Sequence, residues 1–118
     1  MRVAMLDHPD HLNIVEERWQ NMAIYYAMIV PEGSGSIKHL PFFKDPLITY
    51  NLTNRDKINL AQGLKKLCEL LIAAGATTLY PSINGGPIIT DKNDLNQLPK
   101  QIDPVNTSLM TVHLFSSC

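Results

Sequence analysis

The chain has 118 residues, of which 45% are hydrophobic and 18% are charged, and its formal net charge is −1. This size suits a single domain, and the plentiful apolar residues with balanced charges exclude a disordered chain. The sequence has no basic stripe for a nucleic-acid partner, and no apolar stretch long enough for a membrane span or signal peptide. Cys68 and Cys118 are too few for a disulfide framework, which predicts a cytoplasmic protein.

The first half of the sequence predicts one short helix followed by strands. Residues Asp10–Asn21 carry apolar side chains at a spacing that suits a short amphipathic helix. Ala23–Val30 is rich in β-branched and aromatic residues and predicts a strand buried on both faces. Ser36–Leu40 and Leu47–Leu52 alternate like half-buried strands, and the short connector Pro41–Pro46 implies that they pair antiparallel.

The clearest element is a long amphipathic helix that begins after Thr53. Thr53 is a good N-cap, and Asp56 stands three residues later, where a capping box needs a side chain that reaches back. Gly75 suits a left-handed residue at the C-terminal end. An apolar stripe recurs at steps of three and four residues through Leu60, Leu64, Leu67 and Leu71. The stripe predicts a helix of about five turns that packs on the preceding sheet.

The last third of the chain is less regular. Ala76–Pro81 predicts another strand, and the polar tract Asn84–Asn106 predicts a loop with one short helical turn near Asp94–Leu98. Leu109–Cys118 has a strand pattern that runs directly into the terminus, so we expect the chain to be cut from a longer protein. The whole pattern predicts an α+β fold in which an antiparallel β-sheet packs against one long amphipathic helix.

Histidines occur in two places where they could carry chemistry. His8, Asp10 and His11 offer metal-ligating groups, but Pro9 breaks the helical spacing that would align the histidines. An exposed loop is the favoured interpretation, and no metal site is predicted. His113 lies in an apolar strand, where a hydrogen-bonded core residue is more common than a catalyst.

The glycines do not form a nucleotide-binding loop. Gly33-x-Gly35 joins two predicted strands rather than a strand and a helix, and the third glycine of a dinucleotide motif is missing. A hairpin turn explains these residues. We therefore predict that the chain has no cofactor-binding residues of its own.

Two stretches resemble the glucose-methanol-choline (GMC) oxidoreductase family. The first is similar to a family helix that ends in an Ala-Gly-Ala turn, and it comprises Asp56, Leu60, Gly63-Leu64, Leu67, Leu71 and Ala73-Ala74-Gly75-Ala76. The second, Val112–Cys118, is similar to the start of the family's C-terminal motif His-Pro-x-Gly-Thr-Cys-Arg-Met-Gly. His113 and Cys118 match that motif, Ser117 replaces Thr, and Leu114 and Ser116 depart from Pro and Gly. The resemblance extends from about Ala23 onward.

The resemblance implies the family's substrate-binding domain and a role in FAD-dependent oxidation of an alcohol to a carbonyl compound. It also implies that His113 is the general base, a role that suits an imidazole near neutral pH. The family's FAD-binding motif and its second catalytic residue have no counterpart in this sequence. Residues 1–118 are therefore expected to be one partial domain that is inactive alone and binds no FAD. Its expected partners are an FAD-binding domain or partner chain, a small alcohol substrate, and further copies of itself in a homo-oligomer.

Two other functions are kept open. A stand-alone α+β binding or assembly module without catalytic activity would fold stably and ignore flavin. A small metal-dependent enzyme that uses His8, His11 and His113 is the least favoured, and metal analysis of the purified protein would test it.

Overall fold

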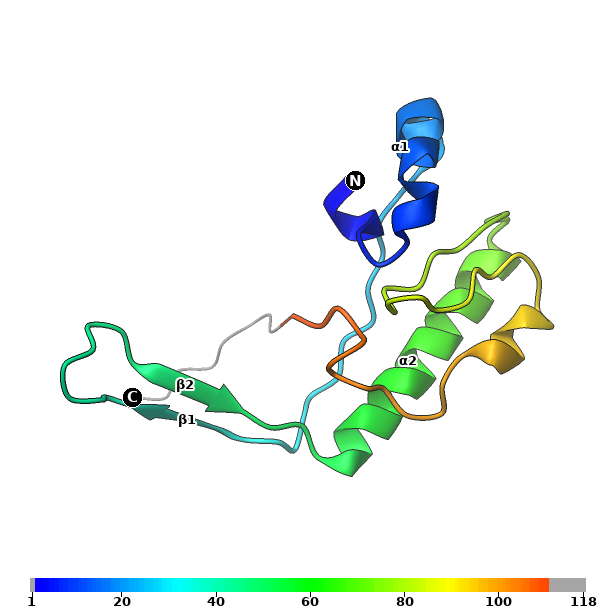
Figure 1. The fold of residues 1–118 in the computed structure, drawn as a ribbon. Coiled ribbons are helices and arrows are strands. Elements are labelled where there is room, and N and C mark those ends of the chain that lie inside the picture. Colours follow the sequence, from blue (N-terminus) through cyan, green and yellow to red (C-terminus); the bar gives the residue numbers. More distant parts are fainter. Residues whose placement is uncertain (1, 111–118) are drawn as a thin grey trace.

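The computed structural model of the chain describes residues 2–110 and combines two helices, a β-hairpin and several short 3-10 turns (Figure 1). The α+β class and the antiparallel pairing are confirmed. The predicted N-terminal helix is also confirmed, as α1 flanked by two turns. The elements are η1 (Arg2–Met5), η2 (Pro9–His11), α1 (Leu12–Arg18), η3 (Trp19–Asn21), β1 (Gly35–Lys38), β2 (Leu47–Tyr50), α2 (Asn54–Ala73) and η4 (Asp94–Gln97). Within this described part, no helix is long and apolar enough to cross a membrane.

Both ends of α2 form as the sequence predicts. Thr53 and Asp56 make a complete capping box, in which each side chain accepts a hydrogen bond from the other residue's backbone N–H. At the other end Gly75 has φ of 96°. The N–H of Gly75 donates to the Ile72 carbonyl and the N–H of Ala76 donates to that of Leu71, which is the bonding pattern of a Schellman motif.

The apolar side of α2 packs on the loop that follows it, which corrects the predicted packing on the sheet. The main core cluster consists of Cys68, Ile89, Leu95 and Leu98, with Leu64, Ile72, Leu79 and Ile83 packed against it. The N–H of Ile102 donates to the Lys57 carbonyl at 3.1 Å and ties the end of the loop to the start of α2. The loop covers this face because Gly75 turns the chain back along the helix, and because the loop carries large apolar side chains.

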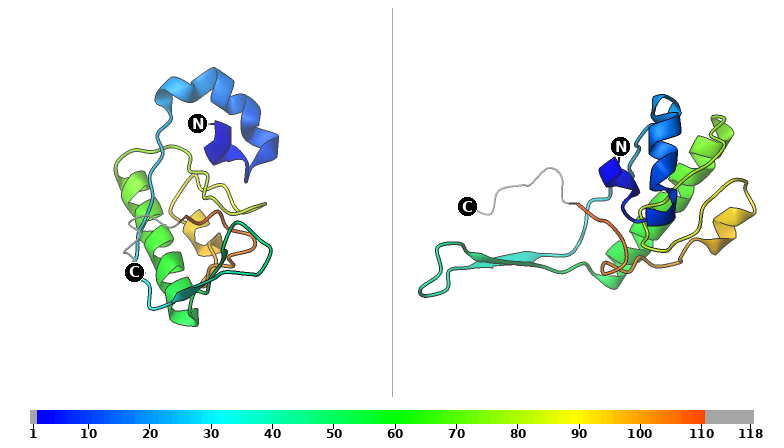
Figure 2. Two further views of the ribbon diagram at one scale, coloured as in Figure 1. Left: turned by 90° about the vertical axis from the view of Figure 1, so that its left-hand side faces the viewer. Right: turned by 45° about the horizontal axis from the view of Figure 1, so that its top comes forward.

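The hairpin projects away from α2, as Figure 1 and the right-hand view of Figure 2 show. Its register pairs Gly35 with Tyr50 and Ile37 with Ile48, and all residues of both strands are exposed. The sheet therefore has two strands in the described part of the chain, and neither strand contributes to the core.

The predicted buried strand at Ala23–Val30 is wrong. This segment is extended but unpaired, and it runs alongside α2 from the N-terminal helices to the hairpin (Figure 1). Tyr26 and Val30 are 72% and 93% exposed, respectively. A β carbon on Gly63 of α2 would lie 3.4 Å from that of Ala27, which places the segment against the helix. β-branched and aromatic residues favour an extended backbone, but a strand also needs a neighbouring chain to bond.

The predicted strands after α2 do not form as strands in the described residues. In Ala76–Pro81 only Leu79 pairs, in an isolated bridge with Ile89. Most of the predicted strand Leu109–Cys118 lies outside the described residues, and Ser108–Met110 are not in a strand. The predicted loop and its helical turn are confirmed by η4.

Candidate functional site

The residue predicted to be catalytic, His113, lies outside the described residues, as does Cys118. The most organised polar site in residues 2–110 is instead centred on Asp56, where the extended segment meets the start of α2. Sequence reasoning found Asp56 only as a helix cap. No local sequence pattern indicates its hydrogen bonds with Glu32 and Gly33, which lie more than twenty positions earlier.

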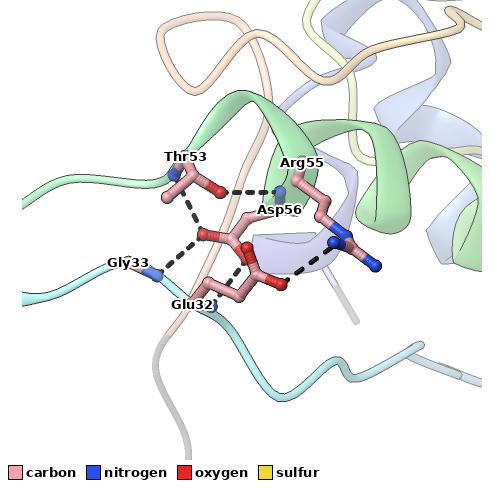
Figure 3. A network of polar contacts seen from close by, with 5 residues as sticks. All are labelled: Glu32, Gly33, Thr53, Arg55 and Asp56. Carbon is pink, nitrogen blue, oxygen red and sulfur yellow. Dashed lines mark hydrogen bonds and ion pairs between the residues drawn. The ribbon is translucent and has the colours of Figure 1, made fainter.

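The Asp56 carboxylate joins three separate backbone positions (Figure 3). It accepts hydrogen bonds from the N–H groups of Glu32 at 2.8 Å, Gly33 at 2.9 Å and Thr53 at 2.9 Å. The Asp56 side chain is completely buried, and an exposed ion pair between Arg55 and Glu32 (3.5 Å) lies beside it. The carboxylate thus fixes both the N-terminus of α2 and the chain that enters the hairpin.

The surroundings of Asp56 stabilise its ionised form. The backbone N–H of Glu32 lowers the pKa of the carboxyl group most, and burial opposes this, while bonds from Thr53 and Gly33 lower the pKa further. The positive end of the helix dipole also favours a negative charge at this position. Because the buried carboxylate accepts hydrogen bonds from three backbone N–H groups, it holds the backbone in place at this position.

Gly33 allows the chain to pass close to Asp56, and we predict that Gly33→Ala is destabilising. A β carbon at this position would overlap the backbone carbonyl oxygen of Asn51. The backbone must then move, at a cost of about 1–3 kcal/mol in the free energy of unfolding, which a urea titration can measure. Ser34→Ala is the matched control because Ser34 is exposed. Equal urea unfolding midpoints for the two variants would contradict the close passage of the chain at Gly33.

His8 is buried and is followed by the short turn η2, which corrects the exposed loop that the sequence favoured here. The buried His8 ring donates its Nε2–H to the Pro81 carbonyl at 2.7 Å. The rings of His8 and His11 lie 5.6 and 5.8 Å from that of Tyr80, between centroids. Among the described residues, no group of three or more His, Cys, Asp or Glu side chains could hold a metal ion. His8 therefore helps to attach the N-terminal segment to the chain that follows α2.

The N-terminus of α2 does not suit the pyrophosphate of FAD. A dinucleotide needs a site for its pyrophosphate, and helix N-termini commonly provide one. The N-terminus of α2 already holds the Asp56 carboxylate, which would repel a phosphate group. No buried side-chain nitrogen or oxygen atom in residues 2–110 lacks a hydrogen-bond partner that a ligand could supply.

The chain is similar to one part of a curated oxidoreductase. No family profile matches the chain, and no solved structure is significantly similar to it. An uncharacterized GMC-type oxidoreductase of Sinorhizobium fredii is 38% identical over 103 residues. The match covers 86% of this chain but 20% of that protein, so the chain spans about one fifth of the length of its relative. The chain therefore corresponds to a piece of a GMC-type oxidoreductase.

Proposed function

We propose that this chain is one part of an FAD-dependent enzyme that oxidises the CH–OH group of an alcohol with hydride transfer to flavin. The match to the S. fredii protein carries this proposal, because it covers most of the chain at 38% identity. Residues 1–118 form one partial domain in this proposal. Their location is cytoplasmic, in keeping with the free, buried thiol of Cys68.

The flavin belongs to another domain or to a partner chain. In support of this, the N-terminus of α2, a position that commonly binds a phosphate group, already holds the Asp56 carboxylate. The flavin supplies the hydride acceptor, so the isolated chain has no catalytic activity. The exposed apolar surface of the isolated chain leads it to self-associate.

His113 is the residue that acts on the substrate in this proposal. Its neutral imidazole accepts the proton of the alcohol hydroxyl group while the hydride leaves the carbon. The support is the resemblance of Val112–Cys118 to the family's C-terminal motif, in which His113 occupies the first position.

The test uses the native polypeptide that contains this sequence, captured from source cells with an antibody raised against the chain. A band several times larger than 118 residues, with a flavin absorption spectrum that bleaches on anaerobic addition of an alcohol, is the expected result. A band of the size of this chain, with neither flavin nor a flavin-containing partner, would overturn the proposal and favour a non-catalytic module.

We predict that His113→Ala in that flavoenzyme lowers kcat by about 10²–10⁴-fold, because a general base is lost. The flavin content and the unfolding midpoint should remain unchanged. His39→Ala is the matched control, since His39 is exposed and lies at the start of the hairpin turn. Turnover within twofold of the parent enzyme for His113→Ala would exclude this residue as the base.

A further inference from the structure

Asn84 and Gly85 are the two central residues of an exposed turn in the loop that follows α2. The N–H of Gly86 donates to the Ile83 carbonyl at 2.9 Å, which closes a β-turn over these four residues. Gly85 has φ of 63°, in the left-handed region that glycine enters without strain. Both central residues are exposed, so water reaches the turn.

The pair carries both groups needed for an intramolecular reaction. The backbone nitrogen of Gly85 can attack the side-chain carbonyl carbon (Cγ) of Asn84 and close a succinimide ring. A glycine hinders this attack least, because it has no β carbon. The site has room for the ring, since a β carbon built on Gly85 would meet no described atom within 4 Å apart from its chain neighbours. Asn84 is the only asparagine in the sequence that precedes a glycine.

The same Gly85 nitrogen helps to attach the N-terminal segment, residues 2–21, to the chain after α2. Its N–H donates to the Asp7 carbonyl at 3.3 Å. The Asp7 carboxylate accepts a hydrogen bond from Ser108 Oγ at 3.1 Å, and the buried ring of His8 makes the next attachment, at 2.7 Å. The Gly85 bond is longer than a usual N–H···O bond, so it restrains the attacking nitrogen only weakly.

We propose that Asn84–Gly85 is a site of spontaneous deamidation, and that the reaction loosens the attachment of the N-terminal segment. In the first step a bond forms between the Gly85 nitrogen and Asn84 Cγ, the bond from Cγ to Nδ2 breaks, and ammonia leaves with the proton of the Gly85 nitrogen. Water then opens the imide. Its attack at Cγ gives aspartate, and its attack at the main-chain carbonyl carbon gives isoaspartate, whose chain continues through the former side chain.

Every stage of the reaction weakens the contact with Asp7. The imide nitrogen carries no hydrogen, so the bond to the Asp7 carbonyl is lost in the intermediate. Both products add a carboxylate next to Gly85, which lines the same surface hollow as Asp7 and Asp10, and like charges repel. Isoaspartate also lengthens the main chain between Gly85 and the N–H of residue 84, which donates to the Asn106 carbonyl at 2.8 Å.

The test incubates the 118-residue chain in mildly alkaline buffer without denaturant and compares its tryptic peptides with those of a chain digested at once. Asn84 is the single asparagine of peptide 67–92, whereas Asn93 and Asn96 lie in peptide 93–100 and precede residues with side chains. Peptide 67–92 should change from amide to acid about tenfold or more faster than peptide 93–100, because Gly85 leaves the attack unhindered. Isoaspartyl methyltransferase should detect isoaspartate in peptide 67–92.

Two results would overturn the site. Equal rates for the two peptides would show that Gly85 gives no advantage. Conversion of Asn84 in urea but not in the folded chain would show that the turn keeps the two reacting atoms apart.

Hydrogen exchange tests the loosening. The amides of α1 should exchange faster in the incubated chain than in the fresh chain. Asn84→Gln is the matched control, because glutamine keeps the amide at this exposed position but closes the larger imide ring much more slowly. Its α1 amides should exchange at the same rate before and after incubation. Unchanged exchange of α1 in a chain whose Asn84 has fully converted would reject the loosening.

Discussion

Replacing Asp56 with alanine should destabilise the chain more than replacing its capping partner, Thr53. Thr53→Ala removes one cap bond, which costs about 1 kcal/mol in the free energy of unfolding. Asp56→Ala removes the acceptor of three backbone N–H groups at once, those of Glu32, Gly33 and Thr53. An N–H group that loses its acceptor away from water costs more free energy than an average hydrogen bond contributes. Urea titration of both variants measures the difference.

Asp56→Asn tests the same site with little change in shape. An amide keeps one acceptor oxygen and introduces N–H groups. If that oxygen stays beside the N–H groups of Gly33 and Thr53, the N–H of Glu32 loses its acceptor. The amide proton of Glu32 should then exchange faster, while those in the middle of α2 change less. Asp10→Asn is the matched control, because Asp10 is exposed. If Asp56→Asn unfolds at the same urea concentration as Asp10→Asn, the network does not anchor the hairpin.

The same network should make the chain sensitive to acid. The pKa of Asp56 is lowered in the folded chain from its ordinary value of 3.8, chiefly by the Glu32 N–H. A lowered folded pKa means that the stabilising contribution is complete above the unfolded pKa and is lost as the pH falls through the folded one. Stability should therefore decline below about pH 4, and less steeply in Asp56→Asn. Asp94 acts in the same direction, since the Thr90 N–H lowers its pKa most.

Replacing Ile89 with alanine should lower the free energy of unfolding by about 2–5 kcal/mol, because it leaves a cavity in the core. Ile89 is 0% exposed and lies in the cluster with Cys68, Leu95 and Leu98. A chain of this size has little stability to lose, so a large share of the molecules should unfold on mild heating. The unfolding midpoint in urea measures the loss.

Two controls identify the cover of α2. Val105→Ala changes a side chain that is 89% exposed and should alter stability by less than about 0.5 kcal/mol. Ile48→Ala in the hairpin should also have a small effect, and a larger effect for Ile48→Ala than for Ile89→Ala would show that the sheet covers the helix.

Burial raises the pKa of the Cys68 thiol and shields the thiol from solvent. In a Cys118→Ser background, Ile89→Ala should therefore speed the labelling of Cys68.

The sequence by itself determined the elements whose hydrogen bonds join residues close together in the chain. The N-cap at Thr53, the glycine turn at Gly75 and the helical turn near Asp94 each depend on residues three to five positions apart, and all three form as predicted. The hairpin formed for a similar reason, since its two strands are joined by a short connector. The proposed role of His113 also came from the sequence, through a motif that belongs to a known family.

Tertiary structure alone decided what covers α2, where Ala23–Val30 lies, and what Asp56 holds. The apolar stripe of α2 requires a cover but does not specify one, and the loop around Ile89 took that place. The residue pattern of Ala23–Val30 predicts a buried strand, yet no described segment pairs with these residues. Asp56 reaches Glu32 and Gly33 across more than twenty positions. Such contacts depend on the path of the whole chain, because residue spacing fixes geometry only within a turn or a helix.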